Sequence, residues 1–133
     1  MMREEFIRLY KEGKRDFHGV DLSGVDLSGA DLRGADLFDA DLMDANLRGA
    51  DLKDVYLRDA DLTDANLTDA NLSGADLSGA DLMGANLQRT TLCSATIDGA
   101  ILTPGDIGGP GHILYALTTD EAGMIEEKRE SVK

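Results

Sequence analysis

The sequence predicts an all-β solenoid, on three observations. A five-residue unit recurs without a gap from residue 15 to residue 104, a large apolar residue stands at the centre of every unit, and glycine or aspartate ends most of them. The unit reads as a small apolar residue, Asp or Asn, Leu, and two variable residues. It occurs eighteen times in succession, so nearly every residue of this stretch is committed to architecture.

The five-residue period argues against a helix and favours short extended segments. On a helix, at about 100° per residue, successive leucines would step round the axis by roughly 140° and form no apolar stripe. In an extended chain, residues two apart share a face. Ala30 and Leu32 are therefore expected to point inward, and Asp31 and Arg33 outward. The fifth residue must then turn the chain.

The corner position at the end of each unit has the composition of a tight turn. Glycine fills it in nine units and aspartate in six. Glycine, and less easily aspartate, tolerates the positive φ that the third position of a type II turn requires. The sequence therefore predicts positive φ at the corners, with extended segments between them.

The units ADLRG (30–34) and ANLTD (65–69) resemble the repeats of the pentapeptide-repeat family, and the resemblance covers 90 of 133 residues. It implies a right-handed quadrilateral parallel β-helix with four units, and hence twenty residues, in each coil. Eighteen units then give about four and a half coils. Leucines twenty residues apart are expected to stack inside, and Asn46, Asn66 and Asn86 to pass amide hydrogen bonds from coil to coil.

Short helical caps are expected at both ends, because an open solenoid exposes unpaired strand edges. Residues 1–14 predict an N-terminal capping helix from Met2 to Glu12, which Gly13 would end. The β-helix would occupy residues 15–104. Residues 105–133 predict a C-terminal loop followed by a capping helix.

Composition limits the classes of function. The net charge of −13 argues against direct nucleic-acid binding through phosphate neutralisation. The single cysteine, Cys93, fits a reducing compartment, and no apolar run suits a membrane span or a signal peptide. A cytoplasmic location is expected. His18 and His112 have no partner at metal spacing, and nucleotide-binding or hydrolase motifs are absent from the sequence. We expect no enzyme activity, cofactor or metal.

Two sets of outward residues are candidates for partner contact. Phe38 and Tyr56, with Arg58 between them, form an unusual patch on a polar tube, on which Met43 and Met83 are also expected to be exposed. Six carboxylates crowd the second and third coils: Asp39, Asp41, Asp44, Asp59, Asp61 and Asp64. These could bind a basic partner or Ca²⁺, or form a solvated surface of consensus residues.

The function predicted from these features is a non-catalytic, rigid module that binds an unidentified protein partner, with a monomer favoured over a dimer. The alternative is an acidic DNA mimic acting on DNA gyrase or topoisomerase, as in the quinolone-resistance branch of the family. The repeats hold 17 acidic and 6 basic residues, a net charge of −11. A tube about 20 Å long would therefore carry roughly one negative charge per 2 Å, close to the ~1.7 Å of duplex DNA. Its short length is the argument against that alternative.

Overall fold

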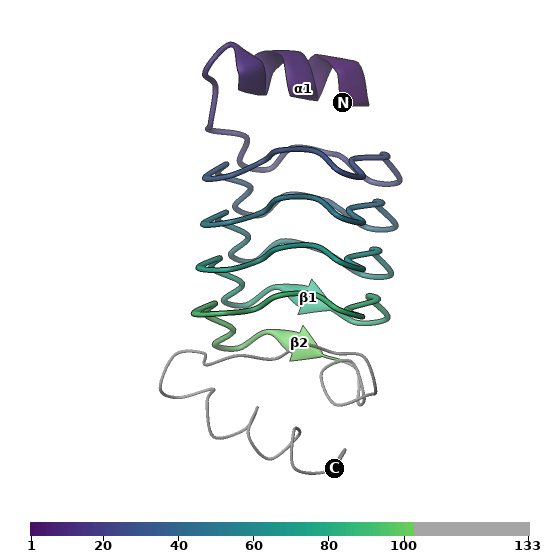
Figure 1. Ribbon diagram of the computed structural model, residues 1–133, viewed down its shortest axis with the longest axis vertical. Coiled ribbons are helices and arrows are strands. Elements are labelled where there is room, and N and C mark those ends of the chain that lie inside the picture. Colours follow the sequence, from purple (N-terminus) through teal and green to yellow (C-terminus); the bar gives the residue numbers. More distant parts are fainter. Residues whose placement is uncertain (103–133) are drawn as a thin grey trace.

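A computed structural model describes residues 1–102 of the chain. Helix α1 (Arg3–Lys11) is followed by a stack of similar coils, and α1 lies across the N-terminal end of the stack (Figure 1). Strands β1 (Asp81–Leu82) and β2 (Ile101–Leu102) pair in parallel. The predicted C-terminal loop and helix lie outside the described residues.

Neighbouring coils pair in one register. The isolated parallel bridges join residues twenty positions apart, as in Asp21 with Asp41 and Asp41 with Asp61. The pairing of β1 with β2 keeps this register, since Asp81 lies opposite Ile101. One turn of the chain therefore takes four units, and equivalent positions of successive coils form columns along the tube.

Each coil is joined to the next by three kinds of backbone hydrogen bond. The N–H of the central leucine and the N–H of the corner residue donate to the following coil, as in Leu42 to the Asp61 carbonyl (2.8 Å) and Asp44 to the Thr63 carbonyl (2.9 Å). The N–H of the second residue donates to the preceding coil, as in Asp61 to the Ala40 carbonyl (2.9 Å). A coil thus presents both donors and acceptors on each edge.

The corners are type II turns. The N–H that follows a corner donates to the carbonyl of the central residue before it, as in Ala45 to Leu42 at 3.0 Å. The corner residue between them, Asp44, has a φ of 60°, and Gly24 has 69°. All described non-glycine residues with positive φ are corner residues: Asp39, Asp44, Asp54, Asp59, Asp64, Asp69, Arg89 and Ser94. The predicted positive φ is confirmed, and the residue that precedes each corner keeps a negative φ, as a type II turn requires.

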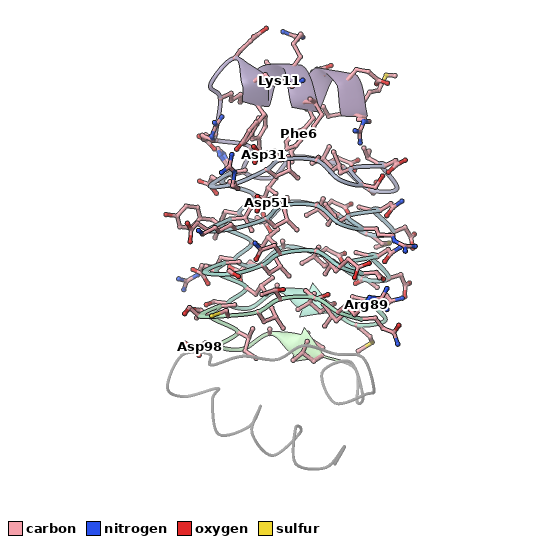
Figure 2. The ribbon with its side chains drawn as sticks, viewed as in Figure 1. Phe6, Lys11, Asp31, Asp51, Arg89 and Asp98 are labelled. Atoms are coloured by element: carbon pink, nitrogen blue, oxygen red, sulfur yellow. The ribbon has the colours of Figure 1, made fainter. Side chains whose placement is uncertain are left out.

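The interior of the tube is filled by side chains. Leu62, in the middle of the stack, is 0% exposed, and the leucines above and below it in the same column, Leu42 and Leu82, are equally inaccessible or nearly so. Alanines, Val55 and Thr90 occupy the other buried inward positions, and Val20, Val25 and Ala100 are partly buried at equivalent positions. The core extends into the helix, because Phe6 is fully buried against Phe17 with 4.5 Å between ring centroids (Figure 2).

Helix α1 begins one residue later and ends one residue earlier than the sequence predicts. Glu4 and Glu5 in its first turn and Arg8 and Lys11 in its last turn complement the helix dipole. Gly13, with a φ of 104°, follows the end of the helix. On the side that faces the first coil, Phe6 is buried and Ile7, Leu9 and Tyr10 pack against the core, whereas Glu4, Glu5 and Arg8 are exposed.

Candidate interaction surface

The consensus aspartates and asparagines of the tube close their own turns. Asp61 accepts a hydrogen bond at Oδ1 from the N–H of Thr63 (2.9 Å), and Asn66 accepts one from Thr68 (3.0 Å). The same contact recurs along the described coils, whichever of the two residues is present. Backbone N–H donors thus offset the repulsion within the stacked carboxylate columns.

This contact also corrects the expected asparagine ladder. The oxygens of Asn46, Asn66 and Asn86 face the backbone two residues ahead, and between the described coils no hydrogen bond joins one asparagine amide to the next. A local partner two residues away is available in every unit, so the amides do not need a partner in another coil.

Tyr56 breaks this pattern. It occupies the position of the turn-closing Asp or Asn, paired in register with Asp36 and Asp76. Units 15–89 contain no other departure from Asp or Asn at this position. The phenol cannot supply an acceptor to the N–H two residues on, and the side chain is 55% exposed. Tyr56 is therefore an exposed aromatic residue at a site where the architecture favours a small polar one.

Phe38 and Arg58 lie beside each other in the same column. They are twenty residues apart, and the N–H of Asp39 donates to the Arg58 carbonyl (2.9 Å). Phe38 is 42% exposed. Position 58 thus follows position 38 in the same column, one coil on, and Tyr56 lies on the same side two residues before Arg58. The ring contacts among residues 1–102 involve the N-terminal aromatics rather than Phe38 or Tyr56.

Arg58 differs from two other arginines of the tube. Arg33 donates to Asp31 (2.9 Å) and lies 3.7 Å from Asp51, and Arg89 donates to Asp69 (2.7 Å). These hydrogen bonds hold the pKa values of the Asp31 and Asp69 carboxyls below their usual range. Arg58 takes part in none of the ion pairs of the described coils.

The predicted acidic surface occupies two adjacent sides of the tube. The corner residues Asp39, Asp44, Asp59 and Asp64 are exposed and have φ values of 59° to 60°. Asp41 and Asp61 are half-buried and close their turns through Oδ1.

The carboxylates of this surface do not converge. Those of Asp59 and Asp64 lie over Gly79 and Gly84 of the next coil, in the space that a Cβ would take. Within residues 1–102 no three His, Cys, Asp or Glu side chains are placed to hold a metal ion. The calcium alternative therefore has no ligand set in this part of the protein.

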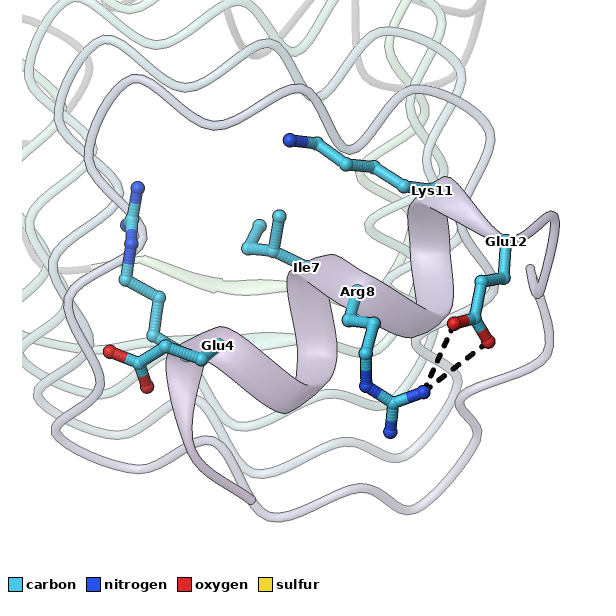
Figure 3. A pocket seen from close by; sticks show the side chains of 6 residues that line it. Glu4, Ile7, Arg8, Lys11 and Glu12 are labelled. Carbon is cyan, nitrogen blue, oxygen red and sulfur yellow. Dashed lines mark hydrogen bonds and ion pairs between the residues drawn. The ribbon is translucent and has the colours of Figure 1, made fainter.

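Among the described residues, three hollows lie at the N-terminal end of the tube, around α1. A groove of about 280 Å³ separates α1 from the first coil between Ile7 and Ala30. A second hollow, of about 470 Å³, runs along α1 and is lined by Arg3, Glu4, Ile7, Arg8, Lys11 and Glu12 (Figure 3). Sequence reasoning missed these features, because they depend on how the helix docks.

Comparison with protein-family models assigns the repeats. The model for pentapeptide repeats matches eight copies within residues 16–54, 40–79, 50–89 and 70–103. These matches cover most of the chain. The chain is a pentapeptide-repeat protein. Solved pentapeptide-repeat proteins form right-handed quadrilateral β-helices, and the parallel stack with four units per coil is that fold.

Solved structures of other pentapeptide-repeat proteins resemble this one. A protein of the Arabidopsis thaliana thylakoid lumen is 42% identical with a TM-score of 0.60, over 61% of this chain and 56% of that protein. Rfr23 of the cyanobacterium Cyanothece 51142 is 27% identical with a TM-score of 0.53, over 75% of this chain and 94% of that protein. The match therefore spans little more than half of the thylakoid protein.

A more distant neighbour is a trypsin-treated form of QnrB1, a plasmid-mediated fluoroquinolone resistance protein, at 20% identity and a TM-score of 0.41, over 85% of this chain and 84% of that protein. This likeness is one of fold alone. No curated protein sequence matches the chain. Among the described residues, α1 is neither long nor apolar enough to cross a membrane.

Proposed function

We propose that this pentapeptide-repeat protein is a non-catalytic protein-binding module whose contact surface is centred on Tyr56. The observation that carries the proposal is the replacement of a turn-closing Asp or Asn by an exposed aromatic ring. The lost turn contact costs stability, on the order of 1 kcal/mol for one hydrogen bond. Residues that break a local rule of their fold are expected at functional sites.

The neighbours of Tyr56 support a contact surface. Phe38 adds a second exposed ring, and Arg58 adds a guanidinium that no carboxylate of the described coils engages. Tyrosine and arginine are enriched among residues that dominate binding energy. Because the corner carboxylates surround this group, the partner that fits is a protein surface with basic residues around an apolar pocket.

Tyr56→Asn should stabilise the protein and abolish partner capture. Asparagine restores the Oδ1 acceptor that closes the turn in other units, so we expect the free energy of unfolding to rise by about 0.5 to 1.5 kcal/mol. Capture should be measured by immobilising the wild type or the variant on beads, incubating the beads with lysate of the source organism, and quantifying the retained partner by mass spectrometry. The variant should lose the protein that the wild type enriches.

The matched control for this experiment is Thr91→Asn. It restores the same consensus residue in another column, without a change of charge. This control should also gain stability and should keep partner capture. If Tyr56→Asn captures the partner as well as Thr91→Asn does, the contact surface does not include Tyr56.

Replacing the four corner aspartates 39, 44, 59 and 64 with glycine should leave the fold intact and weaken capture of a basic partner. A non-glycine residue in the left-handed region carries a cost on the order of 1 kcal/mol. Glycine removes that cost but increases the entropy of the unfolded chain by a similar amount. Thermal unfolding should therefore change little. If the quadruple variant captures the partner as well as the wild type at both low and physiological salt, these four residues contribute to solubility and not to binding.

The complete architecture that we propose has about four and a half coils, with α1 capping the first and residues 105–133 covering the other end. Its cytoplasmic location and monomeric state stay predictions. The DNA-mimic alternative rests on the net charge of −13, and a gyrase supercoiling assay with purified protein tests it directly. Inhibition of supercoiling that survives Tyr56→Asn would favour the mimic over the protein-binding module.

A further inference from the structure

One position on the N-terminal edge of the first coil keeps both of its backbone hydrogen-bonding groups open. In the second coil, the N–H of Asp51 donates to the Ala30 carbonyl (2.9 Å), and the Asp51 carbonyl accepts from the N–H of Leu32 (2.9 Å). Asp31 is the equivalent residue of the first coil, so its N–H and carbonyl point to the side on which no coil precedes. Within residues 1–102, neither group has a hydrogen-bond partner.

The N-terminal segment closes positions on either side of Asp31 along the chain. Nη1 of Arg3 donates to the Asp26 carbonyl (2.5 Å). The hydroxyl of Tyr10 donates to the Arg33 carbonyl (2.6 Å). Asp31 lies between these two capped carbonyls and is exposed. The helix therefore leaves a gap in the edge that it otherwise covers.

The groove between α1 and the first coil lies at this gap. It has a volume of about 280 Å³, with Gly29, Ala30 and Asp31 contributed by the coil and Ile7 and Lys11 by the helix. Ala30 is 7% exposed, whereas the inward alanines of the second coil are at most 1% exposed. Ile7 is half-buried. The groove therefore combines an apolar floor with an unpaired backbone position.

The groove is positively charged. Arg3 and Lys11 both line it, and Lys11 takes part in none of the ion pairs within residues 1–102. The carboxylate that lines the groove, on Asp31, is engaged by Arg33 at 2.9 Å. Figure 3 shows Lys11 extending from the same side of α1 as Ile7. In a protein with a net charge of −13, an acidic ligand meets cations here instead of carboxylates.

We propose that this groove binds an extended acidic segment of a partner protein, which pairs with the backbone of Asp31 and places an apolar side chain between Ile7 and Ala30. An extended segment carries the acceptor and the donor that an open sheet edge requires. A helix uses its backbone groups internally and is about 10–12 Å across, so it would leave Asp31 unpaired. Carboxylates of the segment would contact Lys11 and Arg3.

This groove is separate from the contact surface proposed around Tyr56. The groove lies at the first coil, and Tyr56 lies in the third coil. The inference therefore does not rest on the proposed function, and a purified peptide is enough to test it.

The test uses the full chain and a blocked peptide, Asp-Glu-Val-Ile-Val-Glu-Asp, followed by nuclear magnetic resonance of the protein amides. The control peptide has lysine at each of the four acidic positions. Water-exchange measurements report the protection of the Asp31 N–H. The N–H of Asp26 is the internal comparison, because it also lacks an acceptor among residues 1–102 while its carbonyl is already engaged by Arg3.

We expect the acidic peptide to shift the amide signals of Ile7, Lys11 and Asp31. At a peptide concentration that fills nine-tenths of the sites, exchange at Asp31 should slow about tenfold, since only the free tenth exchanges. Exchange at Asp26 should not change. The lysine peptide should not bind.

The matched protein variants are Lys11→Glu and Arg58→Glu, which make the same change of charge at the groove and at the Tyr56 surface. Lys11→Glu should weaken binding of the acidic peptide by about tenfold, and Arg58→Glu should leave it unchanged. Binding with unaltered exchange at Asp31 would overturn the strand pairing. Equal binding of the lysine peptide, or equal binding by Lys11→Glu, would overturn the charge recognition. The absence of any shift at millimolar peptide would remove the groove as a site without affecting the Tyr56 surface.

Discussion

Leu62→Ala should lower the free energy of unfolding by about 2 to 5 kcal/mol, measured by urea denaturation. Leu62 is 0% exposed and lies mid-tube, with leucines of its column in the coils above and below. Truncation removes its burial and leaves a cavity that the stacked coils cannot close, because the backbone spacing between coils is fixed by hydrogen bonds. A cost below half a kcal/mol would contradict the inward placement.

The matched control for Leu62 is its neighbour Asp61. Asp61→Asn should change the free energy of unfolding by less than about 0.5 kcal/mol, because Asn66 makes the same Oδ1 contact in the next unit. Asp61→Ala removes the acceptor for the Thr63 N–H, and we expect it to cost about 1 kcal/mol. A large loss with Asn would mean that the carboxylate charge, and not the turn contact, stabilises this position.

Deletion of residues 1–13 should convert the protein into an associating species. The deletion uncovers Phe17, which is 3% exposed beneath Phe6. It also frees three backbone carbonyls of the first coil that accept hydrogen bonds from Met1, Arg3 and Tyr10. Exposed apolar columns and an unpaired edge both favour association. Light scattering and sedimentation at micromolar concentration should show higher mass than for the full chain.

The deletion should also reduce stability, because it removes Phe6 and with it the burial of this side chain, which is worth roughly 1.5 to 3 kcal/mol for a side chain of this size. A truncated protein that remains monomeric and melts at the temperature of the full chain would show that α1 has no capping role. Phe6→Ala in the full chain separates the two effects, since it keeps the polar donors of α1 in place.

The repeat predicted much of the fold, because in a strictly periodic chain equivalent positions of all units are expected to have the same conformation and burial. The inward leucines and the positive φ at corners such as Asp44 followed from composition at fixed positions. The asparagine ladder was wrong, because pattern alone does not tell whether an amide bonds within its own turn or across coils. The hydrogen bonds from Arg3 and Tyr10 to the first coil could not be predicted, since they depend on how a helix with no repeat pattern docks.

The candidate surface was only partly predictable. Phe38 and Tyr56 stood out in the sequence as large residues among small polar ones, and the repeat placed them on one side of the tube. The turn-closing hydrogen bond that Asp and Asn make in other units, and that Tyr56 lacks, could not be predicted from the sequence. It depends on the position of Oδ1 relative to the N–H two residues ahead. Arg58 was part of this predicted patch, but only the structure shows that Arg33 and Arg89 are engaged by carboxylates while Arg58 takes part in no ion pair of the described coils.

Where a corner aspartate lies over a glycine of the next coil, the substitutions tolerated at the two positions depend on each other. Asp54, Asp59 and Asp64 each place a carboxylate where a Cβ of the residue twenty positions later would be, and that residue is glycine in all three cases. A side chain gained at Gly74 would require Asp54 to rotate away or to be replaced. A substitution at Gly74, Gly79 or Gly84 is therefore expected to come with a new rotamer or a new residue at the aspartate one coil earlier. The corner pairs Asp39 with Asp59 and Asp44 with Asp64 already combine an aspartate with a side chain in the next coil, so one sequence contains both arrangements of the corner column.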